Sequence, residues 1–306
     1  MIEQTWPIMR PKDGVYRLIE KDNYIAQTKF DGCYATLVKR RSDAILVSRT
    51  GKNDFLPRHP ELGSAILSLP FRDCILAGEL CFFKRGTRID VFLTGMAKPE
   101  TKAERGLEIA YVIFDIIEAD GKSFVNMPFA VRDEYLNNTI KDGPRLFKAQ
   151  TAHNVDEKKE MWNTAVEGVV LKDKDSLIRD GKSKEWLKVK KYKRDDYMVI
   201  ALSHGKGKRA STFGDFYLAD RAEDGSLTYV GKVGTGFTDE ELVYFLKKLK
   251  QSDPYPVGNS DKIDKEVMHW VKPDTVVEIR YRKFTDRGII QNSSFMHERD
   301  DISLEV

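Results

Sequence analysis

The stretch KVKKYKRDDYM, residues 188–198, marks a change of character in this 306-residue chain. A basic run ends there at two aspartates, and an apolar, β-like segment follows. Residues 1–193 carry 34 basic and 28 acidic side chains, whereas residues 194–306 carry 17 and 20. A chain of this length can form two domains, each with its own core. We therefore predict one domain over residues 1–193 and a second over residues 194–306.

The composition is that of a globular protein, with 32% charged and 41% hydrophobic residues. The most apolar run, Ile109–Ile117, contains Asp115 and is far shorter than the ~20 residues of a membrane helix. The N-terminus has no basic flank followed by an apolar stretch, so we expect no secretory signal. Cys33, Cys74 and Cys81 form no CxxC pair, which argues against a zinc site or a disulfide framework and favours the cytoplasm.

The first domain has the pattern of a mixed α/β fold. Its β-like runs are Ala44–Ser48, Cys74–Phe83, Ile109–Ile117 and Gly168–Leu171. Residues Pro60–Leu69 carry apolar side chains at helical spacing, which predicts a helix there.

The second domain has a more informative order of elements. Strand candidates are Tyr197–Ser203, Phe213–Ala219 and Leu227–Val233. A capping box of Thr238 and Glu241 then opens a helix with one apolar face, made of Leu242, Phe245, Leu246 and Leu249. β-rich sequence follows at Val276–Phe284. Three strands, a helix and further strands are the order of an oligonucleotide-binding (OB) barrel, although small α+β domains share it.

The segment Thr28-Lys29-Phe30-Asp31-Gly32 carries the first candidate for chemistry. On its own, Lys29 is either a nucleophile at a turn or a surface lysine before an Asp-Gly turn. An ordered set of motifs downstream favours the nucleophile: Ser48–Asn53, Gly78–Leu80, Tyr111–Asp115, Val166–Lys172 and Trp186–Lys190. Each has a plain structural explanation alone, but this order and spacing are not expected by chance.

This set of motifs resembles the ATP-dependent DNA ligases, members of a nucleotidyltransferase superfamily that also contains RNA ligases and mRNA capping enzymes. Tyr229–Phe237 and Trp270–Pro273 are similar to the barrel of DNA ligases rather than to that of capping enzymes. The resemblance covers nearly the whole chain and is strongest to the ligase module of prokaryotic end-joining enzymes. We expect no attached polymerase or phosphoesterase, and no extra N-terminal DNA-binding domain. The implied fold is α+β, with a nucleotidyltransferase (adenylation) domain of mixed α/β sheets followed by an OB-fold β-barrel.

The resemblance also implies a chemistry. Lys29 would attack the α-phosphate of ATP, and AMP would then pass to a DNA 5′-phosphate, from which a 3′-hydroxyl displaces it. Glu79 and Glu167 would bind Mg²⁺, with Mn²⁺ as an alternative, because carboxylate oxygens suit such hard cations. Lys188 and Lys190, alternate residues of a strand, would hold the α-phosphate together. The remaining implied roles are adenine stacking for Phe114, contact with the nucleotide sugar or the DNA phosphate for Arg49, turn formation for Asp31, nucleotide binding for Lys182 and pyrophosphate orientation for Arg299.

Some positions depart from the family pattern. Tyr34 stands where the family usually has arginine, so it can hydrogen-bond a phosphate but brings no charge. Lys182 also replaces an arginine and lacks its bidentate fork. Around Arg299 the usual basic residues are missing, because Gln291-Asn292 and Ile302 occupy their positions.

Basic segments favour a duplex DNA partner. Residues Lys182–Arg194 hold seven basic residues and one acid, and His204–Arg209 is a basic loop that its glycines should loosen. Such residues suit phosphate contacts, although a solvated face is the alternative for the loop. We predict a monomeric ligase at the prokaryotic nucleoid that seals nicks or breaks in duplex DNA, with end-joining repair proteins as candidate partners. The barrel is expected to swing on a hinge near Lys193–Asp196.

Two other functions remain open from the sequence. One is a related enzyme acting on RNA, either an RNA ligase or a GTP-using guanylyltransferase, against which the barrel motifs count. The other is a non-enzymatic nucleic-acid-binding protein with an inactive site. The joint presence of Lys29, Glu79, Glu167, Lys188 and Lys190 opposes that second alternative.

Overall fold

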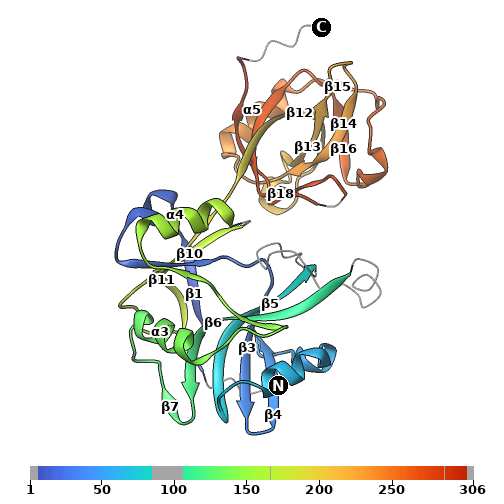
Figure 1. The fold of residues 1–306 in the computed structure, drawn as a ribbon. Helices are drawn as coiled ribbons and strands as arrows, with labels where there is room; N and C mark the ends of the chain where they lie inside the picture. The colour runs from blue at the N-terminus through green and yellow to red at the C-terminus, as the bar shows by residue number, and fades with distance from the viewer. Residues whose placement is uncertain (1–5, 85–105, 166, 286, 302–306) are drawn as a thin grey trace. The chain divides into compact units, whose positions relative to one another are not determined.

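The structure, a computed structural model, describes residues 6–84, 106–165, 167–285 and 287–301. The chain forms two compact units, Met1–Lys190 (unit 1) and Lys191–Val306 (unit 2) (Figure 1). Strands outweigh helices in both, in agreement with the predicted α+β class. None of the described helices is long and apolar enough to cross a membrane.

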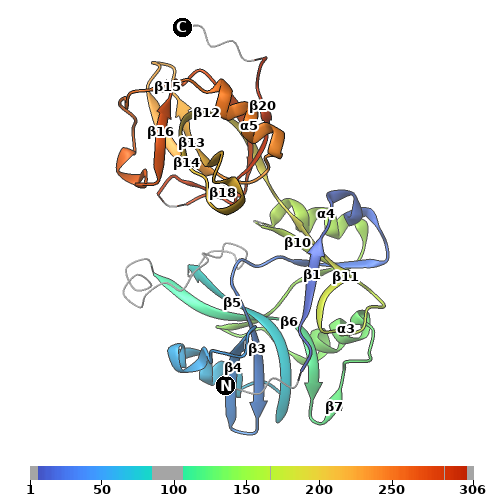
Figure 2. The ribbon, with the colours of Figure 1, turned by 180° about the vertical axis from the view of Figure 1, so that it is seen from behind.

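Unit 1 is built from two sheets, which Figure 2 shows from the reverse side. The first has the order β1-β11-β10-β2-β9, formed by β1 (Met9–Asp13), β2 (Tyr24–Thr28), β9 (Thr151–Ala152), β10 (Gly168–Asp173) and β11 (Gly181–Lys190). The second has the order β4-β3-β5-β6-β7 with β8 beside β6, formed by β3 (Cys33–Arg40), β4 (Asp43–Ser48), β5 (Asp73–Lys84), β6 (Leu107–Ala119), β7 (Lys122–Ser123) and β8 (Leu146–Lys148). The pairs β1–β11 and β6–β8 are parallel.

The long strand β6 pairs with β5, β7 and β8 in the second sheet, and its tyrosine, Tyr111, ties three strands together. The Tyr111 hydroxyl donates to the carbonyls of Ala35 and Leu76, at 3.0 and 2.9 Å. Its ring occupies space that a side chain at position 78 would fill, since a Cβ on Gly78 would lie 2.5 Å from it. The glycine of the Gly78–Leu80 motif is therefore needed for this packing, which fixes the strand that carries Glu79.

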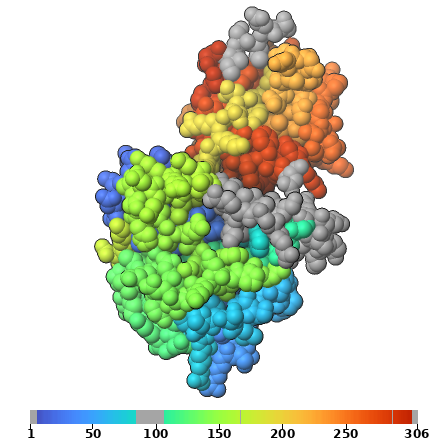
Figure 3. All heavy atoms as spheres, in the orientation of Figure 1, coloured from blue at the N-terminus to red at the C-terminus, as the bar shows by residue number. Residues whose placement is uncertain are grey.

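Helices cover the sheets of unit 1. The helix predicted over Pro60–Leu69 begins as a 3₁₀ turn, η3 (Pro60–Leu62), and continues as α1 (Gly63–Leu67). Further elements are η1 (Tyr16–Glu20), η2 (Leu56–Arg58), α3 (Phe129–Thr139) and α4 (Val155–Thr164). In Figure 3, α4 lies against the blue segment that contains η1. The rings of Tyr16 in η1 and Trp162 in α4 are 5.1 Å apart. Helices α3 and α4 were not predicted, because neither shows a continuous apolar stripe.

Unit 2 confirms the predicted order of an OB barrel. Its elements are β12 (Lys193–His204), η4 (Gly207–Arg209), β13 (Phe213–Arg221), β14 (Leu227–Val233), α5 (Asp239–Lys248), β15 (Gln251–Ser252), η5 (Ser260–Lys262), β16 (Val267–Val271), β17 (Val276–Tyr281), β18 (Lys283–Phe284), β19 (Ile290–Gln291) and β20 (Ser294–Glu298). The sheet runs β14-β13-β12-β16-β15, and β17 pairs with both β12 and β20. The capping box of Thr238 and Glu241 is present, and on the predicted apolar face Leu242, Phe245 and Leu249 are buried while Leu246 is partly buried.

The β-rich stretch predicted over Val276–Phe284 is confirmed, since it forms β17 and β18, which Arg282 separates. The residues of the expected hinge, Lys193–Asp196, belong to β12 and pair with β17. Only Lys191 and Tyr192 lie outside the strands at this junction, because the aspartates are already in the barrel sheet.

Candidate active site

Unit 1 contains a cavity of about 310 Å³ that residues from both sheets line. The motifs converge on it, since its lining includes Lys29, Arg49, Glu79, Phe114, Lys182, Lys188 and Lys190. Tyr34, the residue that departs from the family pattern, lines it as well. Asp31 lies outside the lining, in the turn between β2 and β3, and Arg299 belongs to unit 2.

Lys29 is held by the pairing of β2 with β10. Its backbone N–H donates to the Gly168 carbonyl at 2.9 Å, and its ammonium lies 2.5 Å from Oε1 of Glu167. The Glu167 side chain is only 3% exposed. Gly168 has a φ of +126°, and a Cβ there would lie 2.0 Å from the Val189 carbonyl oxygen. Only glycine fits after Glu167, so the backbone itself fixes this ion pair.

Glu79 is the second carboxyl group of the site. Burial raises the pKa of Glu79 to about 7, the charges of Lys29 and Arg49 act to lower it, and the charge of Glu167 raises it further. Glu79 is therefore close enough to Lys29 and Glu167 for their charges to shift its pKa. The donor set of one buried carboxyl group, Glu167, and one partly buried, Glu79, fits a hard divalent cation that completes its coordination with phosphate and water oxygens.

Strand β11 supplies the cationic wall of the cavity. Its even-numbered residues Lys182, Trp186, Lys188 and Lys190 line the cavity, whereas Leu187 and Val189 face the apolar core. Burial lowers the pKa of Lys190, and the neighbouring charges of Lys188 and Lys29 lower it further. Lys188 also lies 3.4 Å from Asp13 on the adjacent strand β1. Because alternate residues of a strand face the same side, the lysines of β11 place their positive charges together at the cavity, where a bound phosphate can neutralise them.

An aromatic cage around Lys172 forms another part of the lining, which the sequence interpretation missed. The ammonium of Lys172 lies 3.8 Å from the ring centroid of Trp186, 4.5 Å from that of Phe129 and 4.8 Å from that of Phe114. It donates to the Phe114 carbonyl at 2.8 Å, and so does Gln27 at 3.3 Å. Lys172 and Trp186 both belong to the motifs that identified the site. Their place in those motifs was the sequence signal that could have indicated a role in the cavity.

Lys172 predicts a pH dependence of stability. Burial lowers its pKa from 10.5 to about 7, while Asp115 acts to raise it and Arg132 to lower it. Between these pH values the unfolded chain binds the extra proton, so folding stability rises with pH. We expect the free energy of unfolding, relative to that of Lys172→Met, to increase by about 1 kcal/mol from pH 7 to pH 8. Urea unfolding at pH 6, 7, 8 and 9 measures this free energy. If it changes with pH in the same way in both proteins, Lys172 is not the group responsible.

Arg299, the predicted pyrophosphate ligand, is held by carboxylates within unit 2. It makes a bidentate pair with Asp301, in which both N···O distances are 2.8 Å, and a further short contact with Asp196. Its backbone N–H donates to the Val276 carbonyl at the start of β17. The guanidinium is therefore ordered by its own unit.

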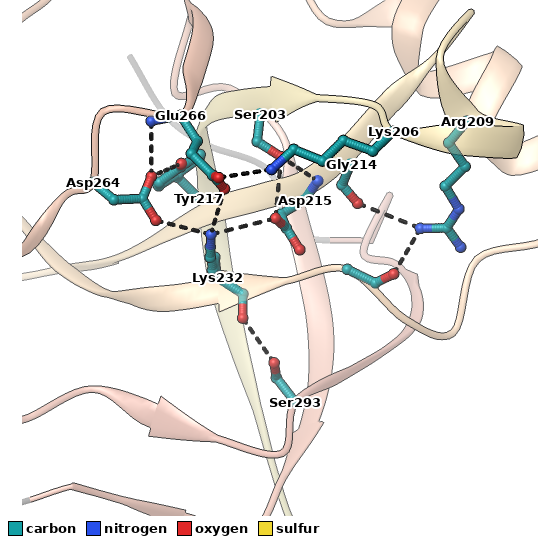
Figure 4. Close-up of polar contacts among 11 residues, drawn as sticks. Ser203, Lys206, Arg209, Gly214, Asp215, Tyr217, Lys232, Asp264, Glu266 and Ser293 are labelled. Carbon is teal, nitrogen blue, oxygen red and sulfur yellow. Dashed lines mark hydrogen bonds and ion pairs between the residues drawn. The ribbon is translucent and has the colours of Figure 1, made fainter.

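The basic loop Lys206–Arg209 is not loose, contrary to the expectation from its glycines (Figure 4). Lys206 donates to Glu266 at 2.8 Å, and Arg209 donates to the carbonyls of Gly234 and Gly214 at 2.6 and 3.3 Å. The glycines instead permit a closed turn, because a Cβ on Gly205 would lie 1.8 Å from the Arg209 carbonyl oxygen. Within the described residues, Lys208 is the loop cation that makes no ion pair or side-chain hydrogen bond, and it is exposed.

The lysine of the barrel motif Tyr229–Phe237 is also structural. Lys232 lies 2.8 Å from Asp264 and 3.5 Å from both Asp215 and Glu266 (Figure 4). These acids come from β13 and from the segment before β16. Lys232 thus joins two parts of the barrel that are distant in sequence.

Two family models match the chain. One, described as the ATP dependent DNA ligase domain, matches residues 10–190, and one described as the ATP dependent DNA ligase C terminal region matches residues 209–302. A DNA ligase of Thermococcus onnurineus (strain NA1) is 30% identical over 272 residues, covering 84% of this chain and 47% of that protein. The multifunctional non-homologous end joining protein LigD of Mycolicibacterium smegmatis is 26% identical over 304 residues, covering 98% of this chain and 39% of that protein. The chain thus spans about half or less of the length of these curated relatives.

Solved structures share the fold. The ligase domain from M. tuberculosis LigD has a TM-score of 0.51 at 22% identity and covers 97% of this chain and 96% of its own. A Lig E DNA ligase has a TM-score of 0.58 at 19% identity and covers 96% of this chain and 99% of its own.

Proposed function

The chain belongs to the ATP-dependent DNA ligases, and we propose that it joins 5′-phosphate and 3′-hydroxyl ends of duplex DNA through a lysine–AMP intermediate. One observation carries the proposal: Lys29 lines a cavity together with Glu79 and the lysines of β11, and its ammonium is paired with Glu167. Such a site can bind a nucleotide phosphate beside a nucleophile. The proposed setting is DNA repair or end joining by a monomer in the cytoplasm, at the nucleoid, with end-joining proteins as candidate partners.

Lys29 is the proposed nucleophile. Its Nζ attacks the α-phosphate of ATP, so an N–P bond forms and the bond to pyrophosphate breaks. The DNA 5′-phosphate then takes AMP from the lysine, and the 3′-hydroxyl displaces AMP as the strand closes. As an ammonium paired with Glu167 the lysine cannot attack, so it must first lose a proton. Lys188 and Lys190 stabilise the negative charge that develops on the α-phosphate.

Other residues position the nucleotide. Phe114 presents its ring to the adenine, and its backbone is fixed by Lys172 and Gln27. Lys182 and Arg49 contact phosphate or sugar oxygens, Asp31 shapes the turn after Lys29, and Arg299 orients the leaving pyrophosphate. Glu79 and Glu167 are the residues that would hold Mg²⁺ or Mn²⁺. When bound, the cation neutralises phosphate oxygens, since hard oxygen ligands suit it.

The test is uptake of AMP followed by sealing. Purified protein is incubated with α-labelled ATP or GTP and Mg²⁺, and then with a nicked duplex of DNA or of RNA. We expect label on the protein from ATP, transfer to nicked DNA and loss of the reaction in EDTA, with recovery by Mg²⁺ or Mn²⁺. Labelling from GTP, or sealing restricted to RNA, would instead identify a different nucleotidyltransferase. Failure of the protein to take up any label would favour a binding protein without ligase activity.

Lys208 predicts how the barrel contacts the DNA backbone. Because its side chain is exposed and unpaired among the described residues, it can neutralise one phosphate. We expect Lys208→Ala to make the slope of the logarithm of the DNA-binding constant against the logarithm of salt concentration shallower by about one. The folding stability of the protein should not change. Arg209→Ala is the matched variant, and it should cost about 1–2 kcal/mol of stability by stranding two carbonyls. Filter binding of a nicked duplex across salt concentrations, with thermal melting, distinguishes the two effects.

A further inference from the structure

Tyr34 occupies the position where the family pattern has an arginine, and the structure gives it a different task from phosphate binding. Its hydroxyl lies 3.0 Å from the Thr36 hydroxyl on the same strand, and the residue is only 8% exposed. The hydroxyl is therefore engaged inside the sheet. What Tyr34 presents to the cavity is its ring.

The register of three strands explains what surrounds that ring. Tyr34 is directly opposite Glu79 on β5, and Ala35 is opposite Ser48 on β4. Continued by one residue, the second pairing brings Arg49 beside Tyr34. Since residues opposite each other point to the same face of a sheet, Arg49, Tyr34 and Glu79 form one row along the cavity wall.

Arg49 depends on this row for its position. Its guanidinium carbon lies 5.2 Å from the centroid of the Tyr34 ring. Arg49 is exposed, and within the described residues no hydrogen bond or ion pair fixes its guanidinium. A cation over an aromatic face is attracted by the ring quadrupole, and arginine also stacks on such faces. The ring of Tyr34 is thus the contact that holds Arg49 at the cavity.

We propose that Tyr34 is a positioning residue whose ring holds the Arg49 guanidinium at the cavity, where Arg49 contacts a phosphate of the nucleotide. This inference rests on the proposed function, because Arg49 acts there on ATP. The cation of this row comes directly after β4, beside the position where the family carries it. The Tyr34 hydroxyl takes no part, because Thr36 engages it. The ring of Tyr34 is itself steadied by Phe114, whose centroid lies 6.0 Å away.

A double-mutant cycle tests the proposal. Tyr34→Leu, Arg49→Ala and the double variant are compared with the parent protein in kcat/KM for ATP in AMP uptake. We expect each single variant to lose about tenfold, and the double variant to lose no more than Arg49→Ala alone. Tyr34→Phe keeps the ring, so the coupling to Arg49 should survive it. The proposal is overturned if the losses of the two single variants multiply in the double variant. It is also overturned if Tyr34→Phe abolishes the coupling to Arg49.

A second aromatic pair provides the matched control. The ammonium of Lys122 lies 5.5 Å from the ring centroid of Tyr135, which is in α3 and outside the cavity lining. Tyr135→Leu removes a comparable cation–aromatic contact, and its effect should multiply with that of Arg49→Ala. A purely structural role of Tyr34 would lower the melting temperature without coupling to Arg49.

Measurement of ATP binding separates this inference from the proposed function. The same cycle is run on the Kd of ATP by titration calorimetry, which requires no chemical step. Coupling in Kd by a protein that takes up no AMP would support the role of Tyr34 and refute the ligase proposal. If the parent protein takes up AMP but the Tyr34 and Arg49 substitutions affect the Kd independently, the ligase proposal is supported and the role of Tyr34 is refuted.

Discussion

Replacing Lys29 with alanine should reduce AMP uptake by more than about a thousandfold, because it removes the amine proposed to form the covalent bond. Lys29→Arg should fail as well, although it keeps the charge beside Glu167, since a guanidinium stays protonated and is not a nucleophile. The pair of variants therefore separates chemistry from electrostatics. Lys21→Ala, which changes an exposed lysine outside the cavity, is the matched control and should retain uptake.

The measurement is retention of labelled AMP on the denatured protein. A phosphoramidate of lysine is cleaved by acid and survives alkali, so the label should follow that pattern in the parent protein. If Lys29→Ala remains labelled, another residue is the nucleophile. Because Lys188 and Lys190 line the same cavity, their alanine variants would then identify it.

The sequence was most informative where a regular period or a local motif decides geometry. Lys188 and Lys190 line one cavity because alternate residues of a strand face the same side. The capping box at Thr238 correctly placed the start of α5, because both partners lie within one turn. The β-like runs of both units correspond to strands, since β-branched and aromatic residues fit a pleated, buried surface.

The sequence was less informative where tertiary contacts decide the position of a side chain and its partners. The cage of Lys172 combines rings from β6, α3 and β11, and no local pattern announces such an assembly. Lys206 and Arg209 looked like free cations, but one is paired with Glu266 and the other with carbonyls of two other segments. The hinge was expected near Lys193–Asp196, and the pairing of β12 with β17 includes these residues in the barrel sheet. In all these cases except the contact of Arg209 with Gly214, the deciding partner lies far away in sequence.

The second large effect concerns the buried pair of Arg132 and Asp115. Arg132 is fully buried and donates to both carboxylate oxygens of Asp115, at 2.8 and 3.0 Å. It also donates to the carbonyls of Met127 and Ser176. One guanidinium thus joins α3, the loop before it and the segment after β10 to the long strand β6. Its removal leaves a buried carboxylate and two carbonyls without their donor.

We expect Arg132→Met to lower the free energy of unfolding by about 3–5 kcal/mol, the range for breaking one partner of a buried ion pair. Adding Asp115→Asn should restore part of this loss, because the uncompensated charge disappears. Arg40→Met breaks the exposed pair with Glu118 and should cost less than about 1 kcal/mol. Urea unfolding followed by tryptophan fluorescence measures all three. Equal costs for Arg132→Met and Arg40→Met would contradict the assignment.

The same variant should also move the pH dependence that Lys172 confers. Arg132 lowers the pKa of Lys172, and Asp115 raises it. When Arg132 is lost, the carboxylate of Asp115 has Lys172 as its nearby cation, so the lysine keeps its proton to higher pH. The rise in stability expected between pH 7 and pH 8 should then begin at a higher pH in Arg132→Met. An unchanged onset would mean that the ion pair and the aromatic cage are electrostatically independent, although both reach the Phe114–Asp115 segment of β6.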